Sequence, residues 1–256
     1  MITLYDIGPC KVPGVKGYSA HVRKIIYTLN YKKLPYIIQL VDYLTLEPTA
    51  QSLGATPTTK RLDGSPRWTV PFIHDSSSGR TVSDSFAIAE YLETTYPNTP
   101  RLFPPGTRGL QAAFCDAVIQ KLVASGIVSI ARPKMQDLGT EVVKESLRVK
   151  YRNTDPSAIP KATEVNQEAL WEKGKDIFDR LADGYPALVE GTSPIFVMVT
   201  EPVFADFALG GLLWEFMVAF GKDSEEWKKM ENWMDGRVGK LVEVLDTIET
   251  SEVGQV

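Results

Sequence analysis

The stretch VPFIHDSSSGRTVSDSFAIAEYLETTYP, residues 70–97, decides the fold of this chain. Two short apolar runs, 70–75 and 80–82, flank a turn rich in serine and glycine, and this pattern predicts a β-hairpin. The apolar residues then recur at helical spacing, so a helix is expected over 85–96. We interpret the rest of the chain outward from this hairpin and helix.

The residues before the hairpin predict a β-α-β unit. Residues 2–5 form a short apolar strand, and residues 36–41 (YIIQLV) form a second, β-branched one. Between them a helix begins at Ser19, with apolar residues at three- and four-residue spacing: Val22, Ile25, Ile26 and Leu29. Residues 42–67 contain several prolines and glycines, which permit only a short or broken helix. The expected order is therefore β-α-β, an irregular stretch, then β-β-α.

A change in composition follows the hairpin and its helix. Four prolines between 97 and 105 predict a linker, and strand signals nearly vanish beyond it. Four to six helices are expected there, at about 107–131, 137–152, 161–183, 203–221 and 224–249. The predicted organisation is an α/β domain over residues 1–97, a linker over 98–105 and an all-α domain over 106–256.

The overall composition excludes several classes of protein. The chain has 256 residues, 43% of them hydrophobic, and a net charge of −4. This composition argues against disorder, and the acidic balance does not favour binding to a nucleic acid backbone. We expect no membrane span and no signal peptide, because no sufficiently long apolar run is present. Two isolated cysteines provide no metal or redox pair, so a cytoplasmic, metal-free protein is expected.

Three places in the first domain are candidates for binding a peptide-like ligand, and each has a purely structural alternative. Pro71 is either an edge-strand proline or a cis turn that leaves the backbone of Val70 open to an extended peptide. Asp84 and Ser85 open a helix, where a carboxylate and an ammonium group can both be held, or they only cap it. The hydroxyl of Ser19 either stabilises a bound thiolate or caps its helix.

In combination, these features resemble the cytosolic glutathione transferases. Residues 82–97 are similar to the stretch of that family that contains the γ-glutamyl-binding acid and serine. Residues 18–36 (YSAHVRKIIYTLNYKKLPY) resemble the fungal FuA-type serine enzymes, which are related to bacterial β-etherases. The resemblance covers both domains. It implies a thioredoxin-like domain, an all-helical domain and a homodimer.

The resemblance also implies roles for the candidate residues. Ser19 would activate the sulfur of glutathione, and Val70 would pair with its cysteinyl backbone beside a cis Pro71. Asp84 and Ser85 would hold the γ-glutamyl group. A hydrophobic, aromatic acceptor would lie between the domains.

Several positions near these residues leave alternatives open. Cys10 is a possible second thiol, and Tyr18 is an alternative hydrogen-bond donor to the thiolate. His21 is expected to point away from Ser19, since it lies two residues further along the helix. The residue that binds the glycyl carboxylate is not identified: three basic residues qualify by charge alone, with solvated surface as the competing interpretation, namely Lys60, Arg61 and Arg67.

One motif departs from the family pattern. The sixth helix of such proteins begins with Ser/Thr-x-x-Asp, but here the sequence is Val203-Phe204-Ala205-Asp206. Valine has no hydroxyl, so half of the capping box is absent, at an expected cost of about 0.5–2 kcal/mol. Asp206 still serves the backbone ahead of the helix.

The function expected from the resemblance is that of a glutathione transferase in xenobiotic detoxification. Glutathione is the co-substrate, and its thiolate attacks a hydrophobic electrophile. Two alternatives stay open: a non-catalytic ligandin that stores aromatic molecules, and a β-etherase-like lyase that displaces an aryloxide.

Overall fold

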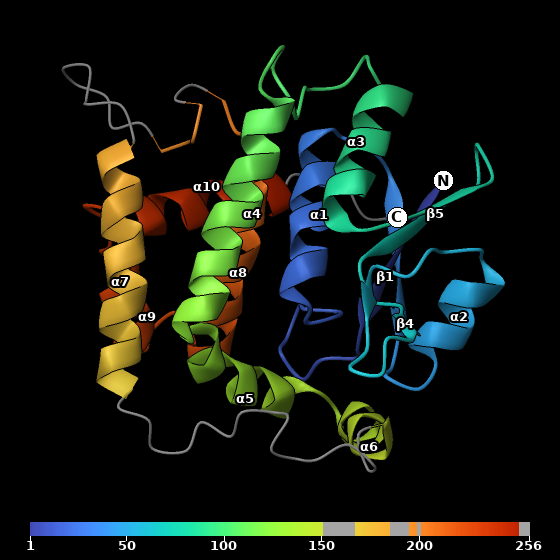
Figure 1. Cartoon of the computed structure of the whole chain (residues 1–256), viewed down its shortest axis with the longest axis horizontal. Coiled ribbons are helices and arrows are strands. Elements are labelled where there is room, and N and C mark those ends of the chain that lie inside the picture. Colours follow the sequence, from blue (N-terminus) through green and yellow to red (C-terminus); the bar gives the residue numbers. More distant parts are fainter. Residues whose placement is uncertain (151–166, 185–194, 199–200, 251–256) are drawn as a thin grey trace.

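The first domain is a four-stranded mixed sheet with helices on both sides (Figure 1). The computed structural model describes residues 1–150, 167–184, 195–198 and 201–250. In order across the sheet, the strands are β2 (Tyr36–Val41), β1 (Ile2–Ile7), β5 (Phe72–Asp75) and β6 (Arg80–Ser83). Only the β1–β2 pair is parallel. The helices are α1 (Ala20–Tyr31), α2 (Leu46–Ser52) and α3 (Ser85–Thr95).

This arrangement confirms the predicted order of the first domain. β1 is two residues longer than expected, and the irregular stretch contains a second hairpin that was not predicted, β3 (Thr59–Lys60) with β4 (Pro66–Arg67). The main hairpin is held to α3 by the buried Asp75, which accepts hydrogen bonds from the hydroxyls of Tyr91 (2.7 Å) and Tyr96 (2.5 Å). Thus a single carboxylate joins the two elements from which the fold was inferred.

The second domain is helical, as predicted, but it is divided differently. Its helices in the described ranges are α4 (Arg108–Ser125), α5 (Val128–Leu138), α6 (Glu141–Lys150), α7 (Gln167–Gly184), α8 (Phe204–Phe220), α9 (Glu225–Glu231) and α10 (Arg237–Thr250). These seven exceed the four to six expected. The last two residues of the helix predicted over 137–152, and the first six of the helix predicted over 161–183, lie outside the described residues.

Two predicted helices are each broken into two by left-handed backbone. The helix expected over 107–131 ends at Gly126, whose φ of 83° closes α4 before α5 begins. The helix expected over 224–249 is interrupted at Met234, Asp235 and Gly236, which have φ of 55°, 57° and 78°. Helical periodicity continues across both breaks, so apolar spacing alone does not show them.

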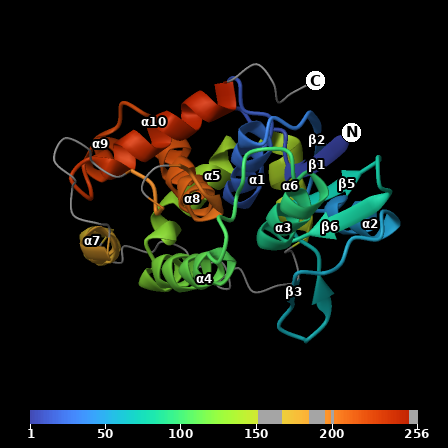
Figure 2. The same ribbon diagram turned by 90° about the horizontal axis from the view of Figure 1, so that it is seen from above.

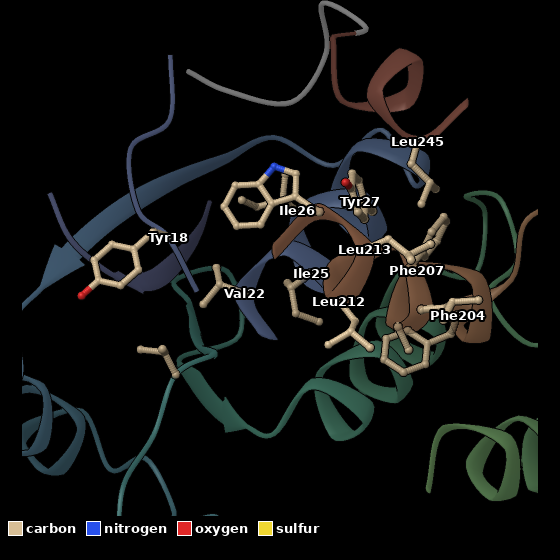
Figure 3. Packing of buried hydrophobic residues seen from close by; sticks show 14 of the residues in the cluster. Tyr18, Val22, Ile25, Ile26, Tyr27, Phe204, Phe207, Leu212, Leu213 and Leu245 are labelled. Carbon is tan, nitrogen blue, oxygen red and sulfur yellow. The ribbon is translucent and has the colours of Figure 1, made fainter. Parts of the chain in front are cut away.

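The two domains share a core in which α1 packs lengthwise on α8 (Figure 3). Gly211 on α8 permits the close approach, because a Cβ there would lie 2.6 Å from the carbonyl oxygen of Ala20. Further along, the ring of Phe207 packs on Tyr27 and Tyr31. Since Ala20 lies beside Gly211 and Tyr31 beside Phe207, the two helices run antiparallel.

A second contact joins the domains just before α1. The backbone N–H of Lys11 donates to Leu138 (2.7 Å), and that of Thr140 donates to Pro9 (3.3 Å). The loop that leads to Ser19 is therefore bonded to the junction of α5 and α6.

No single helix within the described ranges combines the length and apolar character of a membrane span. The pair α4 and α5 meets that measure only jointly, across a bend of 85°.

Candidate functional site

The register of the sheet brings the three candidate places together at one end of it. The backbone N–H of Tyr18 donates to the carbonyl of Ile7, the last residue of β1, so Ser19 lies just beyond that strand. Val70 and Pro71 precede the first residue of β5, which pairs with Tyr5 of β1 on one side and with Ser83 of β6 on the other. Asp84 directly follows Ser83, so it lies at this same end.

Ser19 is the N-cap of α1 through its backbone only. Its φ and ψ of −84° and 118° are extended, and its carbonyl accepts from the N–H groups of Val22 and Arg23 (both 3.0 Å). The hydroxyl makes no capping hydrogen bond. This hydroxyl at a helix N-terminus can therefore donate to a ligand, and the helix dipole favours an anion there.

A buried carboxyl that sequence reasoning missed fixes the backbone of Ser19. Asp6 is 1% exposed and accepts from the N–H of Ile7 (2.6 Å) and of Ser19 (3.3 Å). Gly17 makes room for it, since a Cβ there would lie 2.3 Å from Asp6 Cγ. Burial raises the pKa of Asp6 to about 7, although both hydrogen bonds and Arg23 act to lower it. The sequence signal that could have identified Asp6 is an acidic residue inside the otherwise apolar strand ITLYDI.

The two alternatives to Ser19 are engaged elsewhere. Figure 3 shows the hydroxyl of Tyr18 directed away from the α1 cluster, and it bonds the hydroxyl of Tyr43 (3.3 Å). Burial raises the pKa of Tyr18. The Cys10 sulfur accepts from the N–H of Val12 (3.4 Å), and burial raises the pKa of this thiol as well. The Tyr18 hydroxyl is thus already in a hydrogen bond and the Cys10 thiolate is disfavoured, whereas the Ser19 hydroxyl makes no capping hydrogen bond.

The Val70–Pro71 peptide bond is cis, as the resemblance implied. Val70 lies outside the strands, and its backbone N–H and C=O make no hydrogen bond within the described parts of the chain. Both groups are therefore available to an extended peptide. A second cis bond, Gly8–Pro9, was not predicted.

Asp84 caps α3 and retains a free oxygen. Its Oδ1 accepts from the N–H of Phe86 (2.9 Å) and of Ala87 (3.1 Å), so the structural alternative is correct for this atom. Its φ of 77° and ψ of 133° lie in a region that costs a non-glycine residue about 1–3 kcal/mol. The Ser85 hydroxyl and the second Asp84 oxygen have no hydrogen bond to described residues, so capping does not occupy them.

The three basic candidates differ in their surroundings. The guanidinium of Arg61 is held by Glu47 and by the carbonyl of Pro66. Lys60 is exposed on β3, and Arg67 is partly buried on β4. That one of these residues binds the glycyl carboxylate remains a prediction. Arg61 already forms an ion pair with Glu47.

Asp206 accepts from the backbone ahead of α8, as predicted, and it also binds a second segment of the chain. Val203 is the N-cap of α8 and makes no side-chain cap. Asp206 is fully buried and accepts from the N–H of Val203 and of Val197 (both 2.8 Å). This carboxyl therefore joins the start of α8 to a separate segment of the chain.

Other kinds of site receive no support from the described residues. Among them, no group of three or more His, Cys, Asp or Glu is placed to hold a metal. Two surface cavities of about 470 and 490 Å³ lie in the helical domain, one beside α8, α9 and α10 and the other beside α7 and Trp233. Neither is lined by a residue of the candidate set, and the expected acceptor site between the domains remains a prediction.

Known proteins resemble this chain over nearly its whole length. A protein from Aspergillus flavus, glutathione S-transferase-like protein ustS, is 28% identical over 241 residues, which are 90% of this chain and 84% of that protein. The glutathione transferase GSTFuA3 from Phanerochaete chrysosporium is 31% identical with a TM-score of 0.87, and CsGST63524 of Ceriporiopsis subvermispora, solved in complex with glutathione, is 32% identical with a TM-score of 0.82. Each alignment covers 98% of both chains.

A more distant structure shares the fold alone. The β-etherase LigF from a Sphingobium strain is 17% identical, with a TM-score of 0.57 over 98% of this chain and 96% of that one.

Two family models cover most of the sequence: glutathione S-transferase, N-terminal domain, matches residues 18–95, and glutathione S-transferase, C-terminal domain, matches residues 109–247. With a thioredoxin-like first domain and a helical second one, this chain belongs to the glutathione transferase family.

Proposed function

We propose that this protein is an active glutathione transferase of the serine type, which adds the glutathione thiolate to a hydrophobic, aromatic electrophile. The observation that carries the proposal is the convergence of three unoccupied groups at one end of the sheet. They are the Ser19 hydroxyl, the backbone of Val70, and the pair formed by the Ser85 hydroxyl and the second oxygen of Asp84.

Each group matches one part of glutathione. The backbone of Val70 pairs with the cysteinyl peptide as an added strand would. The Ser85 hydroxyl, at the N-terminus of α3, binds the γ-glutamyl carboxylate, while the second oxygen of Asp84 binds its ammonium group. This leaves the thiol facing Ser19.

Ser19 then acts on the sulfur directly. Its hydroxyl donates a hydrogen bond to the thiolate and so favours the charged form over the thiol, whose proton passes to solvent. The N-terminal dipole of α1 acts in the same direction. The thiolate forms a carbon–sulfur bond to the electrophile, and the electron pair of the broken bond leaves with the departing group.

The remaining expectations belong to the same proposal. The protein is a cytoplasmic homodimer with a role in detoxification, with residues 1–97 binding glutathione and residues 106–256 contributing the acceptor side. The relative CsGST63524, which was solved in complex with glutathione, supports the choice of this co-substrate.

Ser19→Ala tests the proposal. A hydrogen bond to a charged group is worth about 1.5–3 kcal/mol, which is a fall of about 10- to 150-fold in kcat/KM for 1-chloro-2,4-dinitrobenzene. Calorimetric binding of glutathione should change less than threefold, and the ultraviolet absorbance of the bound thiolate should be lost at neutral pH.

Ser224→Ala is the matched control. Ser224 caps α9 with its side chain and lies outside the candidate site, so this variant removes a serine N-cap without touching the proposed chemistry. Activity of Ser19→Ala equal to that of this control would exclude the proposed role. Tight binding of aromatic dyes by a wild-type protein without turnover would instead indicate a ligandin.

A further inference from the structure

The antiparallel packing of α1 and α8 places a second set of charged groups beside Ser19. A Cβ on Gly211 would lie 2.6 Å from the Ala20 carbonyl oxygen and 2.9 Å from Lys24 Cγ, so these residues adjoin. Glu215 follows Gly211 by one helical turn, in the direction of the start of α1. Its side chain therefore extends from α8 beside the first turn of α1, the turn that Ser19 precedes.

Lys24 is a mostly buried residue whose ammonium group reaches the surface and has no partner among the described residues. It is 7% exposed, and its ammonium group forms neither a hydrogen bond nor an ion pair within the described residues. Burial lowers its pKa, while Cys115, Asp84 and Glu215 lie near enough to raise it. A charge that has lost most of its solvent contact is costly without a partner, and such groups are normally paired. The arrangement favours an anion that arrives with a ligand.

Arg132, from a third helix, is a second cation that forms no ion pair with the described residues. It is exposed on α5, which packs on α8 (Figure 2). Burial raises the pKa of the half-buried Glu215 to about 7, against the effect of both Arg132 and Lys24. In the described parts of the chain, both cations act on the Glu215 carboxyl group without forming an ion pair with it.

The pKa of His21 is also affected by the positive charges of Lys24 and Arg132. Its side chain is accessible, although protein surrounds most of it. This desolvation, together with the charges of Lys24 and Arg132, lowers the pKa of His21 to about 4. His21 is therefore neutral near pH 7, and the four side chains carry a net charge of +1 or +2, depending on whether Glu215 is ionised.

We propose that the electrophile of this protein is an aromatic carboxylate, whose negative group binds between Lys24 and Arg132 while its reactive carbon faces the sulfur at Ser19. This inference rests on the proposed function and names the substrate class. It changes the expectation of a purely hydrophobic acceptor. Apolar residues hold the ring, and the cations select the charged group at its far end.

A matched pair of electrophiles tests the selectivity. 4-(Chloromethyl)benzoate and its methyl ester react with thiolates in the same displacement, but only the first is anionic. The wild-type enzyme should have the higher kcat/KM for the carboxylate. Lys24→Met and Arg132→Met should each lower that value at least tenfold and change the value for the ester less than threefold.

Lys134→Met is the matched control, since it removes one positive charge from the same helix. The Lys134 ammonium lies over the ring of Phe220, 4.8 Å from its centroid, toward the C-terminal end of α8. This variant should behave as wild type with both electrophiles. Equal losses in all three variants would show a general charge effect and overturn the proposed pairing.

A binding measurement separates this inference from the proposed catalysis. Calorimetric titration with unreactive 4-methylbenzoate should show binding that weakens at least tenfold in Lys24→Met, with glutathione binding unchanged. If turnover is absent but this binding is found, the catalytic proposal fails and the anion site stands. If Lys24→Met instead weakens glutathione binding, Lys24 holds the γ-glutamyl carboxylate and the acceptor assignment is wrong.

Discussion

Gly211→Ala probes the contact that brings the helical domain against the helix of Ser19. The added methyl carbon would lie 2.6 Å from the Ala20 carbonyl oxygen, 2.9 Å from Lys24 Cγ and 3.4 Å from the Lys24 backbone nitrogen. Two of these neighbours are backbone atoms, which cannot turn aside as the end of a side chain can. Relief therefore requires α1 and α8 to move apart.

The cost can be isolated with a second glycine. Overpacking of this kind costs about 1–3 kcal/mol, while replacing a helical glycine by alanine gains up to about 1 kcal/mol in helix propensity. Gly109 lies in α4, and a Cβ there would meet nothing within 4 Å. Gly109→Ala thus carries the propensity gain alone, and the difference between the two variants gives the overpacking cost.

Calorimetry and urea unfolding measure that difference. For a chain of this size, 1 kcal/mol corresponds to about 2–4 °C in Tm, so Gly211→Ala should melt about 2–12 °C below Gly109→Ala. It should also lose transferase activity, because the first turn of α1 is displaced. If both variants melt at the same temperature, or Gly211→Ala is the more stable, the inferred helix contact is wrong.

Two further predictions concern buried carboxyl groups. Asp206→Ala leaves the N–H groups of the buried Val203 and the partly buried Val197 without acceptors, and should lower the free energy of unfolding in urea by about 2–6 kcal/mol. The exposed Asp223→Ala is the control, and equal losses would contradict the role of Asp206. For Asp75, burial opposes ionisation, but hydrogen bonds from Ser77, Tyr96 and Tyr91 outweigh it and lower the pKa to about 2. Because this folded-state pKa lies below the unfolded one, the stabilisation is present above about pH 4 and lost as pH falls toward 2. Tyr91→Phe should therefore destabilise by about 1.5–3 kcal/mol at pH 6 and by less at pH 3; a cost that does not depend on pH would show that the bond to the charged carboxylate is not its source.

The candidate site could be predicted because its members are local features of the chain. A serine or aspartate before a helical run is recognisable as an N-cap, and a proline at a strand start marks an unusual backbone. Ser19 and Asp84 do occupy N-cap positions, and the structure adds which atoms remain free. The hydroxyl of Ser19 is one of them, which no spacing rule reveals.

The groups that sequence reasoning missed act across the chain. Asp6 reaches the backbone of Ser19, 13 residues away, through a space that Gly17 leaves open. Lys24 and Glu215 are brought near each other only by the crossing of α1 and α8. In the sequence each of these is one charged residue among many, and neither periodicity nor charge distinguishes it.

The sequence by itself determined the α/β first domain, the helical second domain and the position of the hairpin, because apolar periodicity and turn residues are encoded within a few positions of each other. It did not determine where α4 and α10 are separated from their neighbours, since left-handed residues break a helix without breaking its periodicity. Only the tertiary structure decided which charges surround Ser19. Those contacts depend on two helices nearly 200 residues apart in the chain, and on glycines that let their backbones touch.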